Sequence, residues 1–277
     1  MRAVLWAVLD GLVLLTKPYR PRSNLILLVR IDLIGDFVLW LDAAKTMISY
    51  YHAQGYNVVL IGNKDWASWA REMGVGDEVW EIDISRFRDQ LAYRWQWLSK
   101  IRKAGFKIAI QPTFSRTFLE GDSLVRASGA HERIGSVGDE SNTTQRVKSW
   151  SNRWYTRLIA AESMQLMELK RNAEFMRGLG FADFRAYVPA IPQAPGKRTN
   201  WLPQQPYAVL VPNASWIGKV WPIDRLIDIA HRLVAYGLHI VVVGGPADRE
   251  HASGLMEAMS GEAVDLVGKT SLGELAE

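Results

Sequence analysis

Apolar residues follow two alternating patterns along this chain of 277 residues. Short runs rich in Val, Ile and Leu predict buried strands, and longer stretches with an apolar residue at every third or fourth position predict helices that bury one face. Strands are expected at 25–30, 57–61, 78–82, 107–111 and 133–136. Helices are expected at 37–51, 66–73, 86–103 and 118–127. Strands that alternate with helices in this way predict a parallel sheet.

A second set of the same elements follows a break in the pattern. After a long helical stretch expected at 150–178, the segment YVPAIPQAPGKRTNWLPQQP is rich in Pro, Gly and Gln, which interrupt both periods. We therefore predict a first domain at 24–190, a linker at 191–206 and a second domain at 207–277. The second domain should contain strands 208–212, 239–243 and 264–267, helices 222–236 and 247–259, and a helix beginning in TSLGELAE. Two consecutive α/β domains predict a ligand-binding cleft between them.

Composition limits the classes of protein that fit this pattern. With 48% hydrophobic residues the chain can bury a sizeable core, and its length favours two domains. The absence of cysteine excludes disulfides and thiolate chemistry and favours a reducing compartment, so the cytoplasm is the expected location. The net charge of +4 is spread along the chain, which favours anionic small molecules or a membrane surface and predicts no nucleic-acid partner.

The first 23 residues form an amphiphilic segment. Residues 4–15 are apolar apart from Asp10 and Gly11, too short a run for a bilayer core that needs roughly 20 residues. Asp10 and the absence of a small-residue cleavage site argue against a signal peptide. We expect a helix that lies on the protein or on the inner face of the membrane, and an ordinary packed helix fits equally well. On a membrane, anionic head groups could contact Lys17, Arg20 and Arg22.

The sequence LILLVRIDLIGDFVL carries the first candidate chemistry. Gly35 is expected to take a positive φ that turns the chain out of the strand, which places Asp36 in the first turn of the next helix. Asp36 is interpreted either as a helix N-cap or as a general base at the cleft, and a helix N-terminus would favour its ionised form. Asp32 is interpreted as a turn former that could brace the loop.

Two strand ends in the second domain also carry polar loops. In VPNASWIGKVWP, Ser215 and Lys219 lie between a buried strand and a helix. The loop could therefore bind phosphate through backbone N–H groups and a positive charge. Alternatively, Lys219 is a solvated surface residue. In VVVGGPADRE, Asp248 and Glu250 could bond ribose hydroxyls or be acids favoured at a helix N-terminus. The sequence has no metal-ligand spacing, serine-hydrolase elbow or dinucleotide fingerprint.

These motifs, together with LVGKTSLGELA, resemble glycosyltransferase family 9, the ADP-heptose:lipopolysaccharide heptosyltransferases, in order and spacing over residues 25–277. The resemblance implies the α/β GT-B fold, in which one Rossmann-like domain mainly binds the acceptor and the other the nucleotide sugar. It implies an inverting, metal-independent transfer of heptose or a related sugar from an ADP-sugar to a lipopolysaccharide core or similar glycolipid, with no cofactor. The missing fingerprint argues against a nucleotide-dependent oxidoreductase on the same kind of sheet.

The resemblance also implies roles for individual residues. Asp36, in the Gly-Asp pair after the first strand, matches the catalytic base. The residues expected at the donor are Lys219 and Ser215 near the diphosphate, Thr270 near the adenosine, and Asp248 and Glu250 near the ribose. Guanidinium groups pair with acidic sugars and phosphates. On that ground the suggested acceptor contacts are Arg30, Arg116 and Arg133.

The sequence departs from the family pattern near its end. Family members continue through a further strand that ends in a D-[ST]-G-x-x-H motif, which does not occur in this sequence. We therefore expect the second domain to be incomplete, with an exposed sheet edge and weak donor binding. The alternative function is that of a truncated, non-catalytic relative that binds the glycolipid acceptor without the nucleotide.

Overall fold

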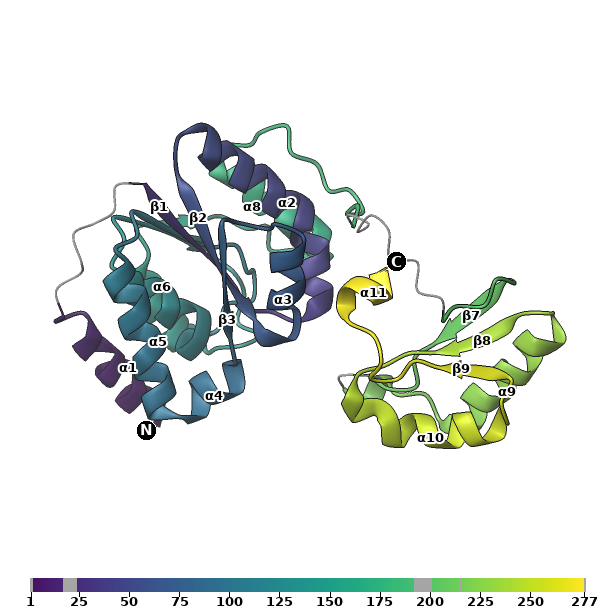
Figure 1. Ribbon diagram of the computed structural model, residues 1–277. Helices are drawn as coiled ribbons and strands as arrows, with labels where there is room; N and C mark the ends of the chain where they lie inside the picture. The colour runs from purple at the N-terminus through teal and green to yellow at the C-terminus, as the bar shows by residue number, and fades with distance from the viewer. Residues whose placement is uncertain (1, 17–23, 192–200, 215, 277) are drawn as a thin grey trace. The chain divides into compact units, whose positions relative to one another are not determined.

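The computed structural model of the chain describes residues 2–16, 24–191, 201–214 and 216–276 (Figure 1). The chain divides into two compact units, Met1–Pro192 and Gln193–Glu277. Each unit is a parallel sheet with its own helices and its own core. Of the helices in the described ranges, none combines the length and the apolar character needed to cross a bilayer.

The first unit contains an all-parallel, 6-stranded sheet with the order β3-β2-β1-β4-β5-β6. Its strands are β1 (Leu25–Arg30), β2 (Asn57–Asn63), β3 (Glu78–Ile82), β4 (Ile108–Gln111), β5 (Glu132–Ser136) and β6 (Arg157–Ile159). β1 lies at the centre, where Leu28 pairs with Leu60 of β2 and with Ile110 of β4. The strand order reverses between β1 and β4, and sheets of this kind bind ligands at the carboxyl end of that switch point.

Helices cover both faces of this sheet (Figure 1). One layer contains α1 (Arg2–Val13), α4 (Ile84–Asp89), α5 (Leu91–Ala104) and α6 (Ser123–Ser128). The opposite layer contains α2 (Ile34–Ala53), α3 (Lys64–Glu72) and α8 (Glu168–Leu179). In this second layer the buried rings of Phe37 and Trp66 stack with their centroids 3.9 Å apart. The stacking fixes α2 against α3, and α2 is the helix that carries Asp36.

Two parts of the first unit differ from the expectation. The helix predicted at 86–103 is divided into α4 and α5, because Gln90 has an extended backbone with φ −112° and ψ 110°. The continuous helix predicted at 150–178 is wrong: the stretch contains the end of α7 (Gln145–Ser151), the strand β6, a coil and most of α8. β6 has only 3 residues, too few to show the two-residue alternation that distinguishes a strand from a helix.

The second unit contains a 3-stranded parallel sheet with the order β7-β8-β9. Its strands are β7 (Tyr207–Leu210), β8 (His239–Val242) and β9 (Ala263–Asp265), and its α-helices are α9 (Ile223–Ala235), α10 (Arg249–Ala258) and α11 (Leu272–Ala276). The order repeats that of β1, β2 and β3 in the first unit. Within the described residues β7 pairs only with β8, whereas β1 is paired on both edges. The predicted small second sheet is therefore confirmed.

Candidate active site

Asp36 lies just after the carboxyl end of β1, in the first turn of α2. Leu33 is the N-cap of this helix and makes no side-chain cap bond, so the interpretation of Asp36 as the N-cap is wrong. Gly35 is already part of the helix and does not have a positive φ, so the expected left-handed turn is also wrong. A Cβ at position 35 would meet no atom within 4 Å. The glycine therefore leaves open space beside Asp36.

The buried side chain of Arg30, the last residue of β1, joins three segments next to Asp36. Its Nε lies 2.7 Å from Asp32 Oδ2, and its Nη2 lies 2.7 Å from Glu168 Oε1 at the start of α8. Nη2 also donates to the backbone oxygen of Asp36 at 3.2 Å, and Nη1 donates to Asn172 Oδ1 at 3.3 Å. Only 1% of Arg30 is exposed. Arg30 thus positions the acidic residues, and its expected contact with the acceptor stays a prediction.

Asp32 holds the loop between β1 and α2. Its Oδ2 accepts a hydrogen bond from Thr113 Oγ1 at 3.0 Å, in addition to its contact with Arg30. Its backbone oxygen accepts a hydrogen bond from Trp66 Nε1 at 2.8 Å. The carboxylate therefore braces the loop through two other segments of the unit, β1 and the segment after β4.

The Asp36 carboxylate is half-buried, and no hydrogen bond or ion pair joins its side-chain oxygens to another residue in the described part of the chain. Burial raises the pKa of Asp36 above the usual value for aspartate, and the negative charges of Asp32 and Glu168 raise the pKa further, while Arg30 opposes them. A carboxylate with a raised pKa holds a proton more strongly. That is the property required of a general base.

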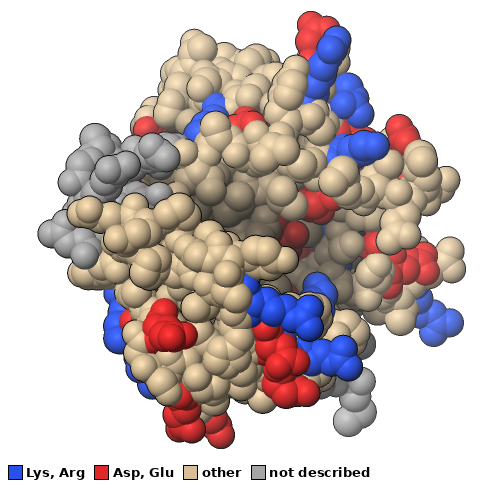
Figure 2. Space-filling model, turned by 90° about the vertical axis from the view of Figure 1, so that its right-hand side faces the viewer, with Lys and Arg blue, Asp and Glu red and all other residues tan. Residues whose placement is uncertain are grey.

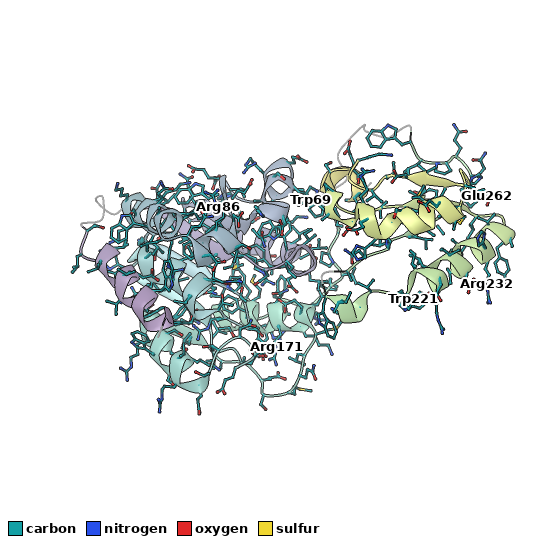
Figure 3. All side chains as sticks on the ribbon, turned by 90° about the horizontal axis from the view of Figure 1, so that it is seen from below. Trp69, Arg86, Arg171, Trp221, Arg232 and Glu262 are labelled. Atoms are coloured by element: carbon teal, nitrogen blue, oxygen red, sulfur yellow. The ribbon has the colours of Figure 1, made fainter. Side chains whose placement is uncertain are left out.

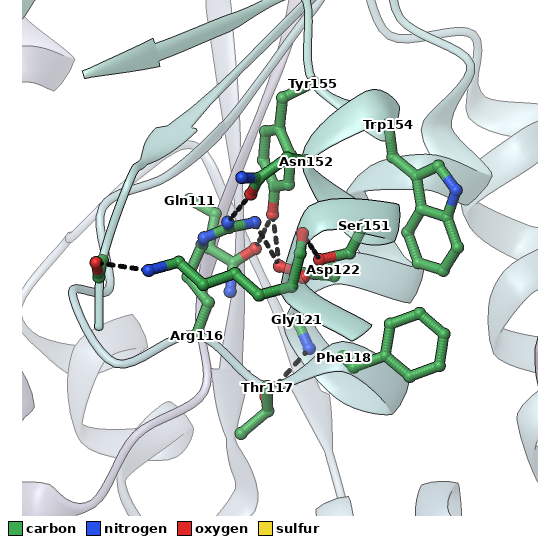
Figure 4. A network of polar contacts seen from close by, with 12 residues as sticks. Gln111, Arg116, Thr117, Phe118, Gly121, Asp122, Ser151, Asn152, Trp154 and Tyr155 are labelled. Atoms are coloured by element: carbon green, nitrogen blue, oxygen red, sulfur yellow. Dashed lines mark hydrogen bonds and ion pairs between the residues drawn. The ribbon is translucent and has the colours of Figure 1, made fainter. Parts of the chain in front are cut away.

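Arg116 belongs to a second buried polar network, at the carboxyl end of β4 (Figure 4). Its Nη1 lies 3.0 Å from Asp122 Oδ1, its Nη2 donates to Asn152 Oδ1, and its guanidinium lies 4.6 Å from the centroid of the Tyr155 ring. The Tyr155 hydroxyl donates to Asp122 Oδ1 at 2.6 Å and contacts the side chain of Gln111. Burial raises the pKa of Tyr155 well above its ordinary value. The network is internal and holds Arg116 in place, and the expected contact of Arg116 with an acceptor stays a prediction.

Arg133 is likewise bonded to internal partners. Its Nε donates to the backbone oxygen of Trp154 at 2.5 Å, and its Nη1 donates to the backbone oxygen of Ala130. These bonds fasten β5 to the turn before β6. The expectation that Arg133 contacts the acceptor stays a prediction, and two of its guanidinium nitrogens already bond backbone carbonyls.

In the second unit, the loops at the carboxyl ends of the strands are bonded to one another. Asp248 Oδ1 accepts a hydrogen bond from Asn213 Nδ2, and Asp248 Oδ2 accepts one from the backbone N–H of Gly245, each at 2.7 Å. Gly268, with a φ of 68°, donates its N–H to the backbone oxygen of Gly244 at 2.8 Å. Asp248 therefore ties the turn after β8 to the loop after β7, and both of its oxygens have internal partners.

The other residues predicted at the donor follow the same strand ends. Lys219 is exposed, and within the described residues its ammonium group has no ion-pair or hydrogen-bond partner. It ends a short 3-10 turn just before Trp221, which precedes α9 (Figure 3). Glu250 is exposed in the first turn of α10, and Thr270 is half-buried between β9 and α11. Ser215 lies outside the described residues.

Charged side chains of both signs are interspersed on the face shown in Figure 2. The net charge of +4 is thus not concentrated in a single basic area of that face. In the described ranges, no group of three or more His, Asp and Glu side chains is arranged to hold a metal ion. We call the group of Arg30, Asp32, Glu168 and Asn172 the Arg30 cluster. In this cluster several charges meet in a defined geometry at the switch point of the first sheet.

Glu168 and Asn172 complete this cluster, although no local pattern in the sequence indicates them. They lie 138 and 142 residues from Arg30 along the chain. An acid in the first turn of a helix is a general preference of helices and carries no information about its partner. The distant pairing is therefore visible only once the chain is folded.

The two parallel sheets, each with its own helices, define an α/β protein built from two Rossmann-like units. The structure is similar to that of a family 9 glycosyltransferase from Veillonella parvula, with a TM-score of 0.69 and 15% identity over 94% of this chain and 73% of that chain. It is also similar to E. coli heptosyltransferase WaaC with ADP, with a TM-score of 0.63 and 20% identity over 91% of this chain and 77% of that chain. For E. coli ADP-heptose lipopolysaccharide heptosyltransferase II the TM-score is 0.60, with 15% identity over 90% and 74%. The predicted GT-B fold is confirmed.

The sequence model of glycosyltransferase family 9 (heptosyltransferase) matches residues 124–277, more than half of the chain. The chain belongs to this family. The family predicted from the motifs is therefore confirmed. A comparison with curated protein sequences gives no match.

Proposed function

We propose that this protein is an inverting, metal-independent glycosyltransferase that moves heptose or a related sugar from an ADP-sugar to a lipopolysaccharide core or similar glycolipid. The observation that carries the proposal is the half-buried Asp36 carboxylate, with its raised pKa, at the switch point of the first sheet in a family 9 chain. Solved structures of WaaC with ADP and with ADP-2-deoxy-2-fluoro heptose support a nucleotide-sugar donor. The absence of cysteine supports a cytoplasmic location.

In the proposed reaction, Asp36 accepts the proton of an acceptor hydroxyl while the hydroxyl oxygen forms a bond to C1 of the donor sugar. The bond between C1 and the diphosphate oxygen breaks, and its electron pair leaves with ADP. Attack from the face opposite the leaving group inverts C1 and requires no covalent intermediate. Asp32 and Glu168 act through Arg30 and through their charges, which keep the Asp36 carboxylate basic.

In the second unit, Lys219 is proposed to bind the donor diphosphate. Its exposed ammonium group without an internal partner can neutralise the charge that develops on the leaving group. Ser215, Thr270 and Glu250 are proposed as further donor contacts. Asp248 is proposed to act indirectly, because its two oxygens already hold the loops after β7 and β8 together.

Asp36→Asn tests the proposed base, since it keeps the shape of the side chain and removes its ability to take a proton. The purified protein is mixed with ADP-heptose and deacylated lipopolysaccharide core, and transfer is followed by ADP release and by the mass of the acceptor. We expect the variant to lose about 100-fold or more in rate. Asp42→Asn, on the same helix, is the matched control and should transfer at the normal rate. Equal transfer by the Asp36 variant, or none by the natural protein, would contradict the proposal.

The small second sheet favours one alternative, a non-catalytic relative that binds the glycolipid without the donor. Calorimetry with ADP separates the two functions. A transferase should bind ADP, and Lys219→Ala should weaken that binding by about tenfold or more, in proportion to the loss of a charge-assisted bond to phosphate. Arg232→Ala, which removes an exposed charge from α9, should leave ADP binding unchanged. Binding of the glycolipid without any binding of ADP would support the alternative.

A further inference from the structure

The loop that follows β4 is attached to two other segments of the first unit. Thr113 Oγ1 donates to Asp32 Oδ2 in the loop after β1, at 3.0 Å. The next residue, Phe114, lies against the guanidinium of Arg171, whose Cζ is 3.7 Å from the centroid of the ring. A cation over an aromatic ring at this distance is attracted by the ring, and more strongly where water is excluded. The loop after β4 is therefore joined to α8, the helix that carries Arg171.

Arg171 is a buried junction between α8 and its surroundings (Figure 3). Only 6% of its side chain is exposed. Its Nη1 donates to the backbone oxygen of Glu162 at 2.9 Å, and its Nη2 donates to that of Met164 at 2.5 Å, both in the coil between β6 and α8. Glu174 Oε2 also lies 2.9 Å from Nη1 and balances the charge. These acceptors hold the nitrogen atoms while the central carbon lies over the Phe114 ring.

The contacts of Arg171 and Thr113 close a path that begins and ends at Asp32. Asp32 contacts Arg30, and Arg30 contacts Glu168 at the start of α8. Arg171 lies three residues after Glu168, in the next turn of the same helix. We call this closed path the contact ring, and its members in order are Asp32, Arg30, Glu168, Arg171, Phe114 and Thr113.

The contact ring contains the charges that act on the proposed base. The charged groups that face the Asp36 carboxyl are Asp32 and Glu168, which raise its pKa, and Arg30, which opposes them. All three belong to the ring, so their separation depends on every contact in it. A side chain whose partners are themselves fixed keeps its geometry better than one held at a single point. The ring thus fixes the acids from both the β4 side and the α8 side.

We propose that Phe114 and Arg171 are positioning residues for the transfer reaction, because their contact closes the ring that fixes the charged neighbours of the base. The inference rests on the role of Asp36 in the proposed function, and it adds two residues that act without touching the sugar. When the contact is lost, the loop after β4 and α8 can separate. Water then reaches the Asp36 carboxyl and the two acids move away from it. Both changes lower its pKa, since burial and the acids are what raise it.

Phe114→Leu tests the proposal, because it keeps most of the apolar volume and removes the ring face that Arg171 contacts. The pKa of Asp36 is measured by carboxyl NMR in the free protein and should fall by about half a unit or more. Phe114→Tyr keeps the ring face and should keep the natural pKa. In the transfer assay, Phe114→Leu should lower kcat about tenfold and change KM little, since a displaced base affects the transition state more than binding.

A matched control separates positioning from stability. Lys100 Nζ lies 3.9 Å from the centroid of a Trp80 ring, on β3 at the edge of the sheet. Trp80→Leu removes this contact of the same kind and should lower the melting temperature while the pKa of Asp36 and kcat stay unchanged. The proposal is overturned if Phe114→Leu lowers the melting temperature alone, or if both variants shift the pKa alike. If the natural chain transfers no sugar, the proposed function fails, and the NMR titration still decides whether the ring sets the pKa.

A second break in the contact ring tests whether it acts as a closed unit. Thr113→Val removes the hydroxyl donor to Asp32 at nearly constant volume and should also lower the pKa of Asp36. The double variant Thr113→Val/Phe114→Leu should shift the pKa by less than the sum of the single shifts, because a ring that is already open loses little at a second point. Additive shifts would show that the two contacts act independently and would overturn the proposal.

Discussion

Replacement of Asp10 by alanine should detach α1 from the first unit. The buried Asp10 carboxylate lies 2.7 Å from Arg94 Nε and 2.5 Å from Arg94 Nη2, and it accepts a hydrogen bond from Ser123 Oγ at 2.9 Å. The change removes these three contacts and leaves the Arg94 guanidinium buried without its counter-charge. Removal of one partner from a buried ion pair costs about 3–5 kcal/mol. We expect a value near the lower end, about 3 kcal/mol, because Arg94 keeps the backbone oxygens of Leu119 and Phe87 as acceptors at 2.7 and 3.3 Å.

This loss should be measurable as a lower melting temperature of the first unit. For a unit of this size each kcal/mol lowers Tm by about 2–4 °C, so a loss of about 3 kcal/mol corresponds to about 6–12 °C. Circular dichroism follows the unfolding, and hydrogen exchange reports on the amides of α1. If α1 undocks before the sheet unfolds, water reaches Arg94 and limits the fall in Tm. The α1 amides should then exchange at the rate of an unfolded chain.

Two companion variants make the measurement specific. Asp183→Ala removes an exposed acid from the same unit and should change stability by less than about 0.5 kcal/mol. Asp10→Ala/Arg94→Leu also removes the isolated buried charge and should recover part of the lost stability. If Asp10→Ala lowers Tm by less than about 2 °C and leaves the α1 amides protected, then the ion pair does not hold the helix and this reasoning is refuted.

Further predictions concern the base and the core of the first unit. Glu168→Gln should move the acidic limb of the pH profile of kcat/KM to lower pH. Loss of the Glu168 charge lowers the pKa of Asp36 and leaves the charge of Arg30 less compensated, so the base stays ionised at lower pH. An unchanged profile would contradict this. Gly135→Ala should lower the free energy of unfolding in urea by about 1–3 kcal/mol, because the new Cβ would lie 2.5 Å from Cε1 of Tyr155. Unchanged stability would show that the ring can move aside.

Local patterns in the sequence were sufficient for most of the fold. The central strand β1 is a continuous apolar run, as is usual for a strand buried on both faces, and its bounds are the predicted ones. The break at Gln90 and the strand β6 were missed, because one extended residue and three paired residues are too short to impose a period. The sequence was therefore least informative where elements are shortest.

The candidate site, like the fold, could be predicted only in part from the sequence. The position of Asp36 at a strand end could be predicted, because the change from one apolar period to the other occurs within a few residues of it. The partners of charged side chains could not be predicted, since they come from distant segments. Arg116, for example, pairs with Asp122 inside the unit, and no local pattern in the sequence indicates that pairing. Asp10 was interpreted as an interruption of an apolar helix, and it is the residue that anchors that helix through Arg94.

The geometry around Arg30 also explains how an arginine can stand beside a base without neutralising it. A guanidinium paired directly with the Asp36 carboxylate would stabilise the ionised form and lower the pKa, which would weaken the base. Arg30 instead directs its ion pairs to Asp32 and Glu168 and reaches Asp36 only through the backbone oxygen. The arginine thereby allows three carboxylates to gather at one strand end while the side-chain oxygens of Asp36 remain open to a proton. Burial and the two neighbouring acids can then outweigh its charge and raise the pKa.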